Sequence, residues 1–200
     1  MQRLETAVDV LNFWFADSPS DSDVASVLDY LKKMFTLWFG GASDHFNKMQ
    51  LHNKDIIEKI ANLSDPIIES AEGWPLTPLG YLARIIVLDQ FPRCCFRGTA
   101  QAFRYDDLAC SYAVKLVKEL DVFYSDFNVA QRLFIIMPFT HSELLPMQEL
   151  AVQCGLAIAT DRPAEVQQYF RGLKGFPDEH RDVLVRFGRF PSRNRPLVRA

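Results

Sequence analysis

The side chains most able to do chemistry are concentrated in three short stretches of the chain. The first, LDQFPRCCFRG (residues 88–98), places an acid, an amide and two arginines around a proline. The second, MPFTHSEL (137–144), places a histidine and a glutamate near a proline, and the third, HRDVLVRFGRFPSRNR (180–195), holds one histidine and five arginines. The nine candidate ligand-binding residues are Asp89, Gln90, Arg93, His141, Glu143, His180, Arg186, Arg189 and Arg193.

The arginines of the first and third stretches predict a site for an anion. An arginine presents a planar fork of N–H donors that binds a carboxylate or a phosphate through two parallel hydrogen bonds. Phe187, Phe190 and Pro191 alternate with the arginines of the third stretch and should pack against the rest of the protein. We therefore predict an anion-binding pocket lined by the four candidate arginines, with both candidate histidines at its rim.

A structural role is the alternative for the same residues. Asp89 continues an apolar helical stripe and is predicted to lie at a helix C-terminus, where the helix dipole disfavours a carboxylate, so it needs Arg93 as a partner. The arginines of the third stretch can likewise neutralise carboxylates such as Asp106 and Glu143, and breaking such a buried pair costs about 3–5 kcal/mol. We expect the arginines to tie the last helix to acidic turns, with two or three left facing a pocket.

His141, Glu143 and His180 are the candidate catalytic residues. In an enzyme, His141 would be a general base oriented by Glu143, and His180 would be a second group able to transfer a proton. Two histidines and a carboxylate also suit zinc or iron, but the spacing lacks a helical HExxH motif, so the sequence predicts no metal and no cofactor. Helix capping by Ser142 and Glu143, with His141 paired inside the fold, is the simpler explanation.

The four cysteines are predicted to be reduced. No CxxC pair or zinc spacing exists, because Cys94 and Cys95 are adjacent while Cys110 and Cys154 stand alone. We interpret them as small core residues. The tryptophans are assigned to the core as well: Trp14, Trp38 and Trp74.

Length and composition predict a soluble protein with a single helical domain over residues 1–200. Apolar residues make up 48% of the chain and charged residues 24%, as in ordinary globular proteins. No segment approaches the roughly 18 apolar residues that a membrane span needs, and the N-terminus lacks a signal peptide, so we expect a cytoplasmic location and no membrane partner. The net charge of -3 and the pI near 5.8 disfavour a nucleic-acid partner, although residues 171–200 are basic.

Helical periodicity dominates the chain. Apolar residues recur every three to four positions, and no convincing run alternates as a strand would. We predict an all-α fold of eight or nine helices, arranged as antiparallel pairs. The predicted segments are roughly 4–15, 22–37, 43–62, 78–90, 99–120, 129–137, 142–159, a helix opening at 161–163, and 178–188.

Capping residues, glycines and prolines set these boundaries. Thr77 followed by Pro78 predicts a helix start, while Pro92 and Pro138 predict helix ends, because proline disfavours the helical conformation in the residue before it. Gly188 predicts the end of the last helix. The remaining signals are the stop at Gly40 and Gly41 and caps at Ser43 or Asp44, Asn128, Ser142, Asp161 and Pro177 with Asp178.

Several blocks together resemble the domain of unknown function 924 family of largely bacterial proteins. The blocks are VLNFWF (10–15), WF (38–39), LDQFPRxxFRG, PFxHSE and HRDxxxRFGRFPxRN. The resemblance covers nearly the whole chain and implies an α-α superhelix similar to tetratricopeptide-repeat proteins, with no defined activity. The family usually has an asparagine near Cys94 or Cys95 and often a histidine where Ser192 stands, so no role is assigned to position 192.

Two functions follow from these residues. The favoured one is a module that binds a small anionic ligand, or a peptide or protein, in the arginine- and histidine-lined pocket. The alternative is a small-molecule enzyme, such as a hydrolase, in which arginines hold an anionic substrate and His141 or His180 transfers the proton. Convergence of the three stretches on one concave pocket would favour a ligand site, whereas arginines fully paired with acids would favour a structural role. The oligomeric state is left open.

Overall fold

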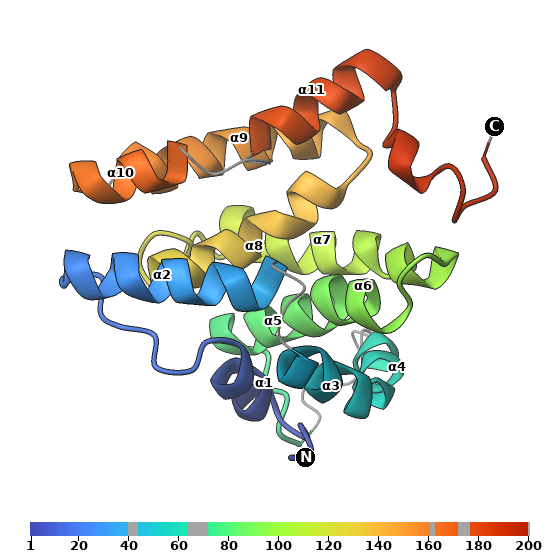
Figure 1. The fold of residues 1–200 in the computed structure, drawn as a ribbon, viewed down its shortest axis with the longest axis horizontal. Coiled ribbons are helices and arrows are strands. Elements are labelled where there is room, and N and C mark those ends of the chain that lie inside the picture. Colours follow the sequence, from blue (N-terminus) through green and yellow to red (C-terminus); the bar gives the residue numbers. More distant parts are fainter. Residues whose placement is uncertain (40–43, 64–71, 161–162, 172–176, 200) are drawn as a thin grey trace.

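A computed structural model describes residues 1–39, 44–63, 72–160, 163–171 and 177–199, and in these ranges all regular structure is helical (Figure 1). The α-helices are α1 (Ala7–Trp14), α2 (Val24–Phe39), α3 (Asp44–His52), α4 (Asp55–Asn62), α5 (Pro78–Ile85), α6 (Phe91–Cys95), α7 (Asp106–Val114), α8 (Val129–His141), α9 (Leu145–Thr160), α10 (Ala164–Arg171) and α11 (Pro177–Phe187). Two π-helical turns, Ile86–Gln90 and Lys115–Glu119, and two 3-10 turns, Ala100–Phe103 and Pro191–Arg193, complete these ranges.

One continuous rod, residues 78–95, forms the centre of the fold. It consists of α5, the first π turn and α6, and it contacts α1, α3, α4, α7 and α8. Its start is the predicted one, since Thr77 Oγ1 accepts a hydrogen bond from the Gly80 amide and Pro78 occupies the first turn. Every residue from 80 to 92 is buried. The rod therefore carries the first of the three chemically active stretches through the interior.

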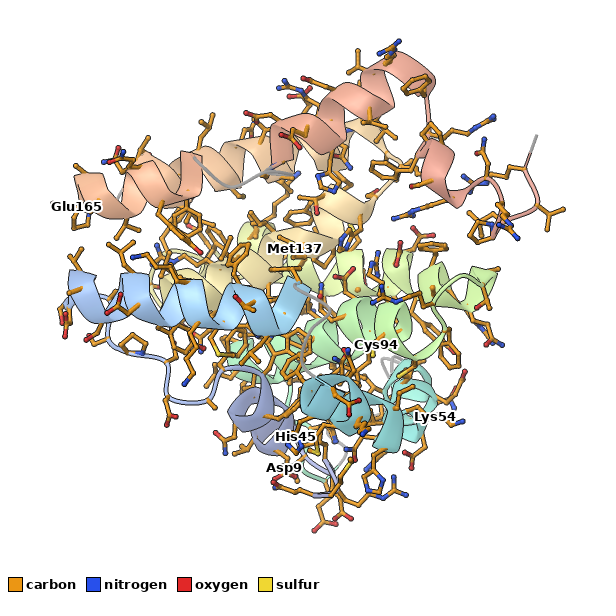
Figure 2. The ribbon with its side chains drawn as sticks, viewed as in Figure 1. Asp9, His45, Lys54, Cys94, Met137 and Glu165 are labelled. Atoms are coloured by element: carbon orange, nitrogen blue, oxygen red, sulfur yellow. The ribbon has the colours of Figure 1, made fainter. Side chains whose placement is uncertain are left out.

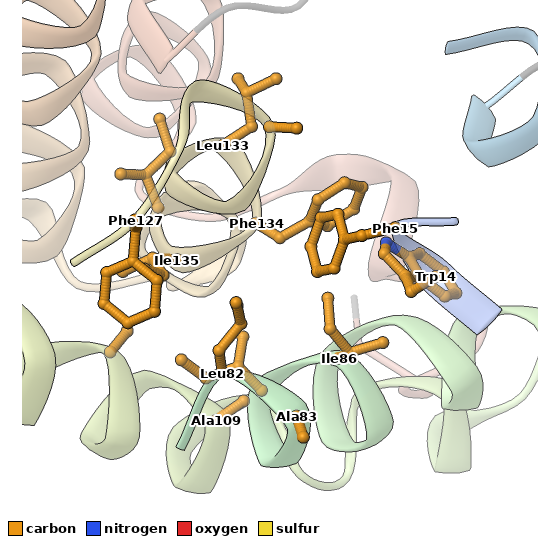
Figure 3. Packing of buried hydrophobic residues seen from close by; sticks show 14 of the residues in the cluster. Trp14, Phe15, Leu82, Ala83, Ile86, Ala109, Phe127, Leu133, Phe134 and Ile135 are labelled. Atoms are coloured by element: carbon orange, nitrogen blue, oxygen red, sulfur yellow. The ribbon is translucent and has the colours of Figure 1, made fainter. Parts of the chain in front are cut away.

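Aromatic packing joins the rod to the N-terminal helix and to α8. Trp14 of α1 makes an edge contact with Phe134 of α8, with the ring centres 5.3 Å apart, and both side chains are almost completely buried. Figure 3 shows Leu82 and Ile86 of the rod pointing into the same cluster. Burial of large apolar side chains contributes about 1.5–3 kcal/mol each, so this cluster fixes where α1 and α8 lie on the rod.

Three further helices lie on the far side of α8. α9 packs against both α8 and α11, and α10 contacts both α9 and α2 (Figure 1). α11 ends at Gly188, whose positive φ of 70° lets the chain turn away, as predicted for this glycine. The segment after it comes down to the start of α7, where Arg193 meets Asp106.

The two proline-based helix ends were predicted wrongly. Pro92 lies inside the rod, because the π turn before it shifts the hydrogen-bond register and makes Pro92 the second residue of a new α-helical segment, where a missing N–H costs nothing. Pro138 lies inside α8, which continues to His141. Both prolines are buried among packed neighbours, and tertiary packing outweighs the local preference.

The count of helices also differs from the prediction. With the rod taken as one helix, the described residues contain ten helices rather than eight or nine, because the predicted helix 43–62 is divided into α3 and α4. Asn53, which is buried between them, accepts a hydrogen bond from the Leu4 amide and donates to the carbonyl oxygens of Met49 and Gln2. The signals at Gly40, Gly41, Ser43 and Asp161 lie outside the described residues.

Within the same ranges, no helix combines the length and the apolar character that a bilayer crossing requires.

Substitution of Leu82 by alanine tests the central position of the rod. Leu82 is fully buried, so removing its side chain is expected to lower the free energy of unfolding by about 2–5 kcal/mol. Leu79, on the same helix, is 47% exposed, and Leu79→Ala is the matched control, with an expected change of about 0.5 kcal/mol or less. Urea denaturation followed by circular dichroism measures both, and equal losses would contradict this assignment of the core.

Candidate functional site

The site is built around a carboxylate that water does not reach. Asp89 lies on the π turn of the rod and has no exposed surface. Its two carboxylate oxygens lie 2.8 and 3.0 Å from Nδ1 of His141, the last residue of α8. A buried charge is tolerated only when it is paired and hydrogen-bonded, and the side chains of Gln90 and Arg93 complete that pairing.

The ionised carboxylate fixes the tautomer of His141. Burial alone would raise the pKa of Asp89, but the charge of Arg93 and the contact with His141 lower it to about 2. An ionised carboxylate can only accept hydrogen bonds, so His141 Nδ1 carries the proton and donates it. Burial and the charge of Arg93 lower the pKa of His141, which keeps the imidazole neutral near pH 7. Nε2 is therefore the unprotonated nitrogen.

Arg93 links this pair to a second buried acid. Its guanidinium lies 3.3 Å from the Asp89 carboxylate and 3.0 Å from that of Asp106, at the start of α7. Burial raises the pKa of Asp106, and the nearby Asp89 carboxylate adds to the effect, against the pull of Arg93. Arg93 is thus shared between two acids, as the structural interpretation expected for Asp89.

Two of the arginines after Gly188, Arg193 and Arg199, bind carboxylates elsewhere in the fold and hold the C-terminal segment in place. Arg193 is 11% exposed, lies 3.1 Å from the Asp106 carboxylate and donates to the carbonyl oxygen of His141 at 2.8 Å. Its guanidinium stacks between the rings of Phe103 and Phe190. Arg193 therefore docks the C-terminal segment onto the Asp89 network.

Glu143 does not orient His141. One of its carboxylate oxygens accepts a hydrogen bond from the Phe190 amide at 3.0 Å, and the other pairs with Arg199 at 2.6 Å. Asp89 takes the orienting role, and a different residue fixes the end of α8. Gln148, fully buried on α9, donates to the carbonyl oxygens of Phe139, Thr140 and Ser142.

The other predicted residues of the third stretch lie apart from the Asp89–His141 pair. The His180 ring centre is 6.4 Å from that of His141, but His180 lines a different, open groove with Phe187 and Phe190. Arg186 is exposed and stacks on Phe187, and Arg189 is exposed as well. Among the described residues, His180 therefore lines a different groove from the cavity that Gln90, Arg93 and His141 line.

A cavity of about 210 Å³ opens beside His141. Gln90, Arg93 and His141 are the predicted site residues that line it, and the side chain of His141 is 18% exposed. Because both Asp89 oxygens lie against Nδ1, Nε2 is the ring nitrogen that takes no part in the pair with Asp89. The cavity is formed where the rod, α8, α3 and the C-terminal end of α2 come together.

Sequence reasoning missed most of the remaining lining. Four further polar residues line the cavity, namely Asn47, Gln50, Cys94 and Arg97, and three aromatic residues complete it, namely Trp14, Trp38 and Phe39. Arg97 makes no ion pair with any residue that the structure describes. Its position four residues after Arg93 was the available signal, whereas the aromatic residues looked like ordinary core.

No three His, Cys, Asp or Glu side chains in the described ranges are grouped so as to hold a metal ion. The three candidate ligands lie in separate surroundings: His141 contacts Asp89, Glu143 accepts from the Phe190 amide, and His180 lines the open groove.

The comparisons with known proteins agree with this architecture. Residues 10–200 match the model of a family described as bacterial protein of unknown function (DUF924). The chain belongs to this family. It is also similar to the solved structure of a protein of unknown function from Agrobacterium tumefaciens, with 27% sequence identity and a TM-score of 0.64, over 97% of this chain and 90% of that chain. No curated protein matches the chain.

The pH dependence of stability tests the buried carboxylate. Because the pKa of Asp89 is lower in the folded than in the unfolded state, its contribution is complete above the unfolded value of about 4 and is lost as pH falls towards about 2. Asp89→Asn is expected to lower the free energy of unfolding by about 3–5 kcal/mol at pH 6. The difference from wild type should shrink between pH 4 and pH 2, as measured by urea denaturation at each pH. A difference that stays constant over that range would show that Asp89 is not ionised in the fold.

Proposed function

We propose that the protein is a small-molecule enzyme that binds an anionic substrate in the cavity and uses His141 as a general base in its hydrolysis. The observation that carries the proposal is the fully buried Asp89 carboxylate against Nδ1 of His141, a histidine that lines the cavity and whose Nε2 is left unprotonated. A histidine oriented by a carboxylate in this way can take a proton from water, and the carboxylate then stabilises the imidazolium.

The charges around the cavity favour an anionic substrate. Arg93 already balances Asp89 and shares Asp106 with Arg193, whereas Arg97 has no carboxylate partner in the described part of the chain. Arg97 is thus the cation available to bind a carboxylate or a phosphate, with the exposed edge of Arg93 beside it. A volume of about 210 Å³ is below the roughly 300–1,000 Å³ of pockets for drug-sized ligands, so the substrate is a small metabolite.

The same groups supply the parts of a hydrolytic reaction. His141 Nε2 accepts a proton from a water molecule as the water attacks the carbonyl or phosphoryl centre of the substrate. The negative charge that develops on the substrate oxygen is stabilised by Arg97 and Arg93, and electrostatic stabilisation of this kind is often the largest contribution to catalysis. Trp38 and Phe39 give the cavity an apolar wall for the rest of the substrate.

The alternative function, a module that binds a ligand without catalysis, would use the same cavity. In a superhelix of the tetratricopeptide type, the ligand would lie on a concave surface between helix pairs. In this protein the oriented histidine borders the cavity between the rod and α8, and a module that only binds a ligand has no need of such a histidine. The two functions differ only in turnover, so an experiment can separate them.

Anion binding is the first expected outcome. Inorganic phosphate and benzoate are expected to raise the midpoint of thermal unfolding and to show saturable binding by calorimetry. Arg97→Gln should weaken this binding about 10- to 100-fold, because a hydrogen bond to a charged group contributes about 1.5–3 kcal/mol. Arg186→Gln, which changes an exposed arginine outside the cavity, is the control and should bind as wild type does. Equal losses in the two variants would place the anion elsewhere.

Hydrolysis is the second expected outcome. Among small aryl esters and phosphate esters, those that carry a carboxylate or phosphate are expected to be cleaved in preference to matched neutral esters. His141→Gln should lower kcat by about 10²- to 10⁴-fold, whereas His180→Gln should leave it within about twofold. In wild type, kcat/KM should fall as pH drops through the pKa of His141, which lies below its usual value near 6.5.

Retention of the full rate in His141→Gln would contradict the general-base role. Binding of the anions without turnover of any ester would leave the binding module as the function.

A further inference from the structure

Cys94 lies in the wall of the same cavity. It is the fourth residue of α6, it is half-buried, and Figure 2 shows it where α6 faces α3. Its Sγ is 3.7 Å from the side-chain oxygen of Asn47 and 3.9 Å from the Asn47 backbone oxygen, long contacts that keep the sulfur in place without sealing it from the cavity. The sequence-based assignment of Cys94 to the core is therefore wrong.

The other three cysteines have different surroundings. Cys110 and Cys154 are buried, and burial raises their pKa values to about 12 and about 11. Cys95 is not among the residues that line the cavity, donates to the Gln50 carbonyl oxygen at 3.5 Å, and has a raised pKa because of its interaction with Cys94 and its burial. Cys94 is thus the cysteine that a small molecule in the cavity can reach.

Positive charge next to Cys94 favours its reactive form. The interaction with the neighbouring Cys95 thiol and the charge of Arg97, acting against burial, lower the pKa of Cys94 to about 7. The thiolate is the nucleophilic form of cysteine, and reactive cysteines characteristically lie in partly exposed, electropositive sites. Arg97 would also attract an anionic reagent to the sulfur, because it has no carboxylate partner in the described residues.

A separate feature of this cavity suits a bound ligand. Trp14 lines it and is only 1% exposed, and its indole N–H has no acceptor among the described residues. Buried donors are almost always paired in folded proteins, so an unpaired one on a residue that lines the cavity calls for an acceptor, which a bound molecule could supply. The cavity therefore offers a hydrogen-bond donor, a cation and a thiol to the same small molecule.

We propose that Cys94 is a modification site, at which a peroxide oxidises the sulfur and a small anionic thiol then joins it as a mixed disulfide that fills the cavity. The modified protein would be unable to bind its anionic ligand, because the adduct occupies the space beside His141 and pairs with Arg97. The anionic preference rests on the proposed function of the cavity, whereas the reactivity of the sulfur does not.

The two steps balance without any group beyond these reagents. The Cys94 thiolate attacks one oxygen of hydrogen peroxide, the O–O bond breaks and hydroxide leaves, so the sulfur is oxidised by two electrons to a sulfenic acid. The second thiol attacks that sulfur, the S–O bond breaks, and the hydroxyl group leaves as water with the proton of the thiol. A reducing thiol in excess reverses the disulfide and restores Cys94.

Alkylation of the native protein tests the reactivity of Cys94. The protein is treated with limiting iodoacetate, which is anionic, or iodoacetamide, which is neutral, and peptide mass spectrometry measures the rate at each of the four cysteines. Cys94 is expected to react first with both reagents. The ratio of its iodoacetate rate to its iodoacetamide rate should fall about tenfold in Arg97→Gln, since Arg97 attracts the anion. Equal reactivity at all four cysteines would overturn the modification site, and an unchanged ratio in the variant would overturn its preference for an anionic thiol.

Oxidation tests the second step. Dilute hydrogen peroxide with glutathione, an anionic thiol, should give one adduct per chain at Cys94, whereas cysteamine, a cationic thiol, should give far less. Cys95→Ser should still form the glutathione adduct and Cys94→Ser should not. The modified wild type should lose phosphate binding, and excess dithiothreitol should restore it. An adduct at another cysteine, or phosphate binding that survives modification, would contradict the inference.

The phosphate titration separates this inference from the proposed function. Cys94→Ser is expected to bind phosphate as wild type does, because its binding groups are intact. If Cys94 does not react with either reagent while the protein still binds phosphate, the modification site is overturned and the proposed anion site stands. Absence of phosphate binding in both proteins would instead overturn the proposed anion site, and with it the expected preference for iodoacetate.

Discussion

A carboxylate without contact with water must be neutralised from inside the protein, and Asp89 draws its partners from separate parts of the chain. Arg93 comes from its own rod and His141 from the end of α8. Arg93 and Arg193 then meet at Asp106, which connects α7 and the C-terminal segment to the same network. Exposed ion pairs contribute little to stability, but removing one partner from a pair this deeply buried strongly destabilises the fold, because the other charge is left unpaired. The position of α8 relative to the rod is thus set by charge as well as by apolar packing.

The division of work among the arginines explains why a basic C-terminal region occurs in a protein with a net negative charge. Arg193 and Arg199 hold the C-terminal segment in place, because Arg193 binds the carboxylate of Asp106 on α7 and Arg199 binds that of Glu143 between α8 and α9. Arg97 belongs to the first stretch, and it is the one placed at a cavity without an acidic partner among the described residues. Arginine content alone therefore does not distinguish the arginines that hold the C-terminal segment in place from the arginine that borders the cavity.

Much of the fold could be predicted from the sequence, and the site only in part. Helix periodicity, the Thr77–Pro78 start and the Gly188 end depend on neighbouring residues, so local patterns reveal them. Local patterns do not reveal that helices continue through Pro92 and Pro138, because a π turn and tertiary packing offset the local cost of each proline. The partner of His141 was assigned to Glu143, two residues away, whereas Asp89, which orients it, is 52 residues distant in sequence. The aromatic wall and Cys94 were taken for core because composition cannot distinguish a buried side chain from one that borders a small cavity.

The π turn of the central rod also makes the number of residues a constraint. Each residue of an α-helix turns the chain by about 100°, so the gain or loss of one residue between Leu82 and Arg93 would rotate everything after it by that angle. Arg93 and Arg97 would leave the cavity even though every side chain needed there was still encoded. A substitution in this rod changes the packing at one place, whereas an insertion or deletion outside the π turn changes the direction of every later side chain, so the spacing of the segment is expected to be preserved more strictly than its apolar residues.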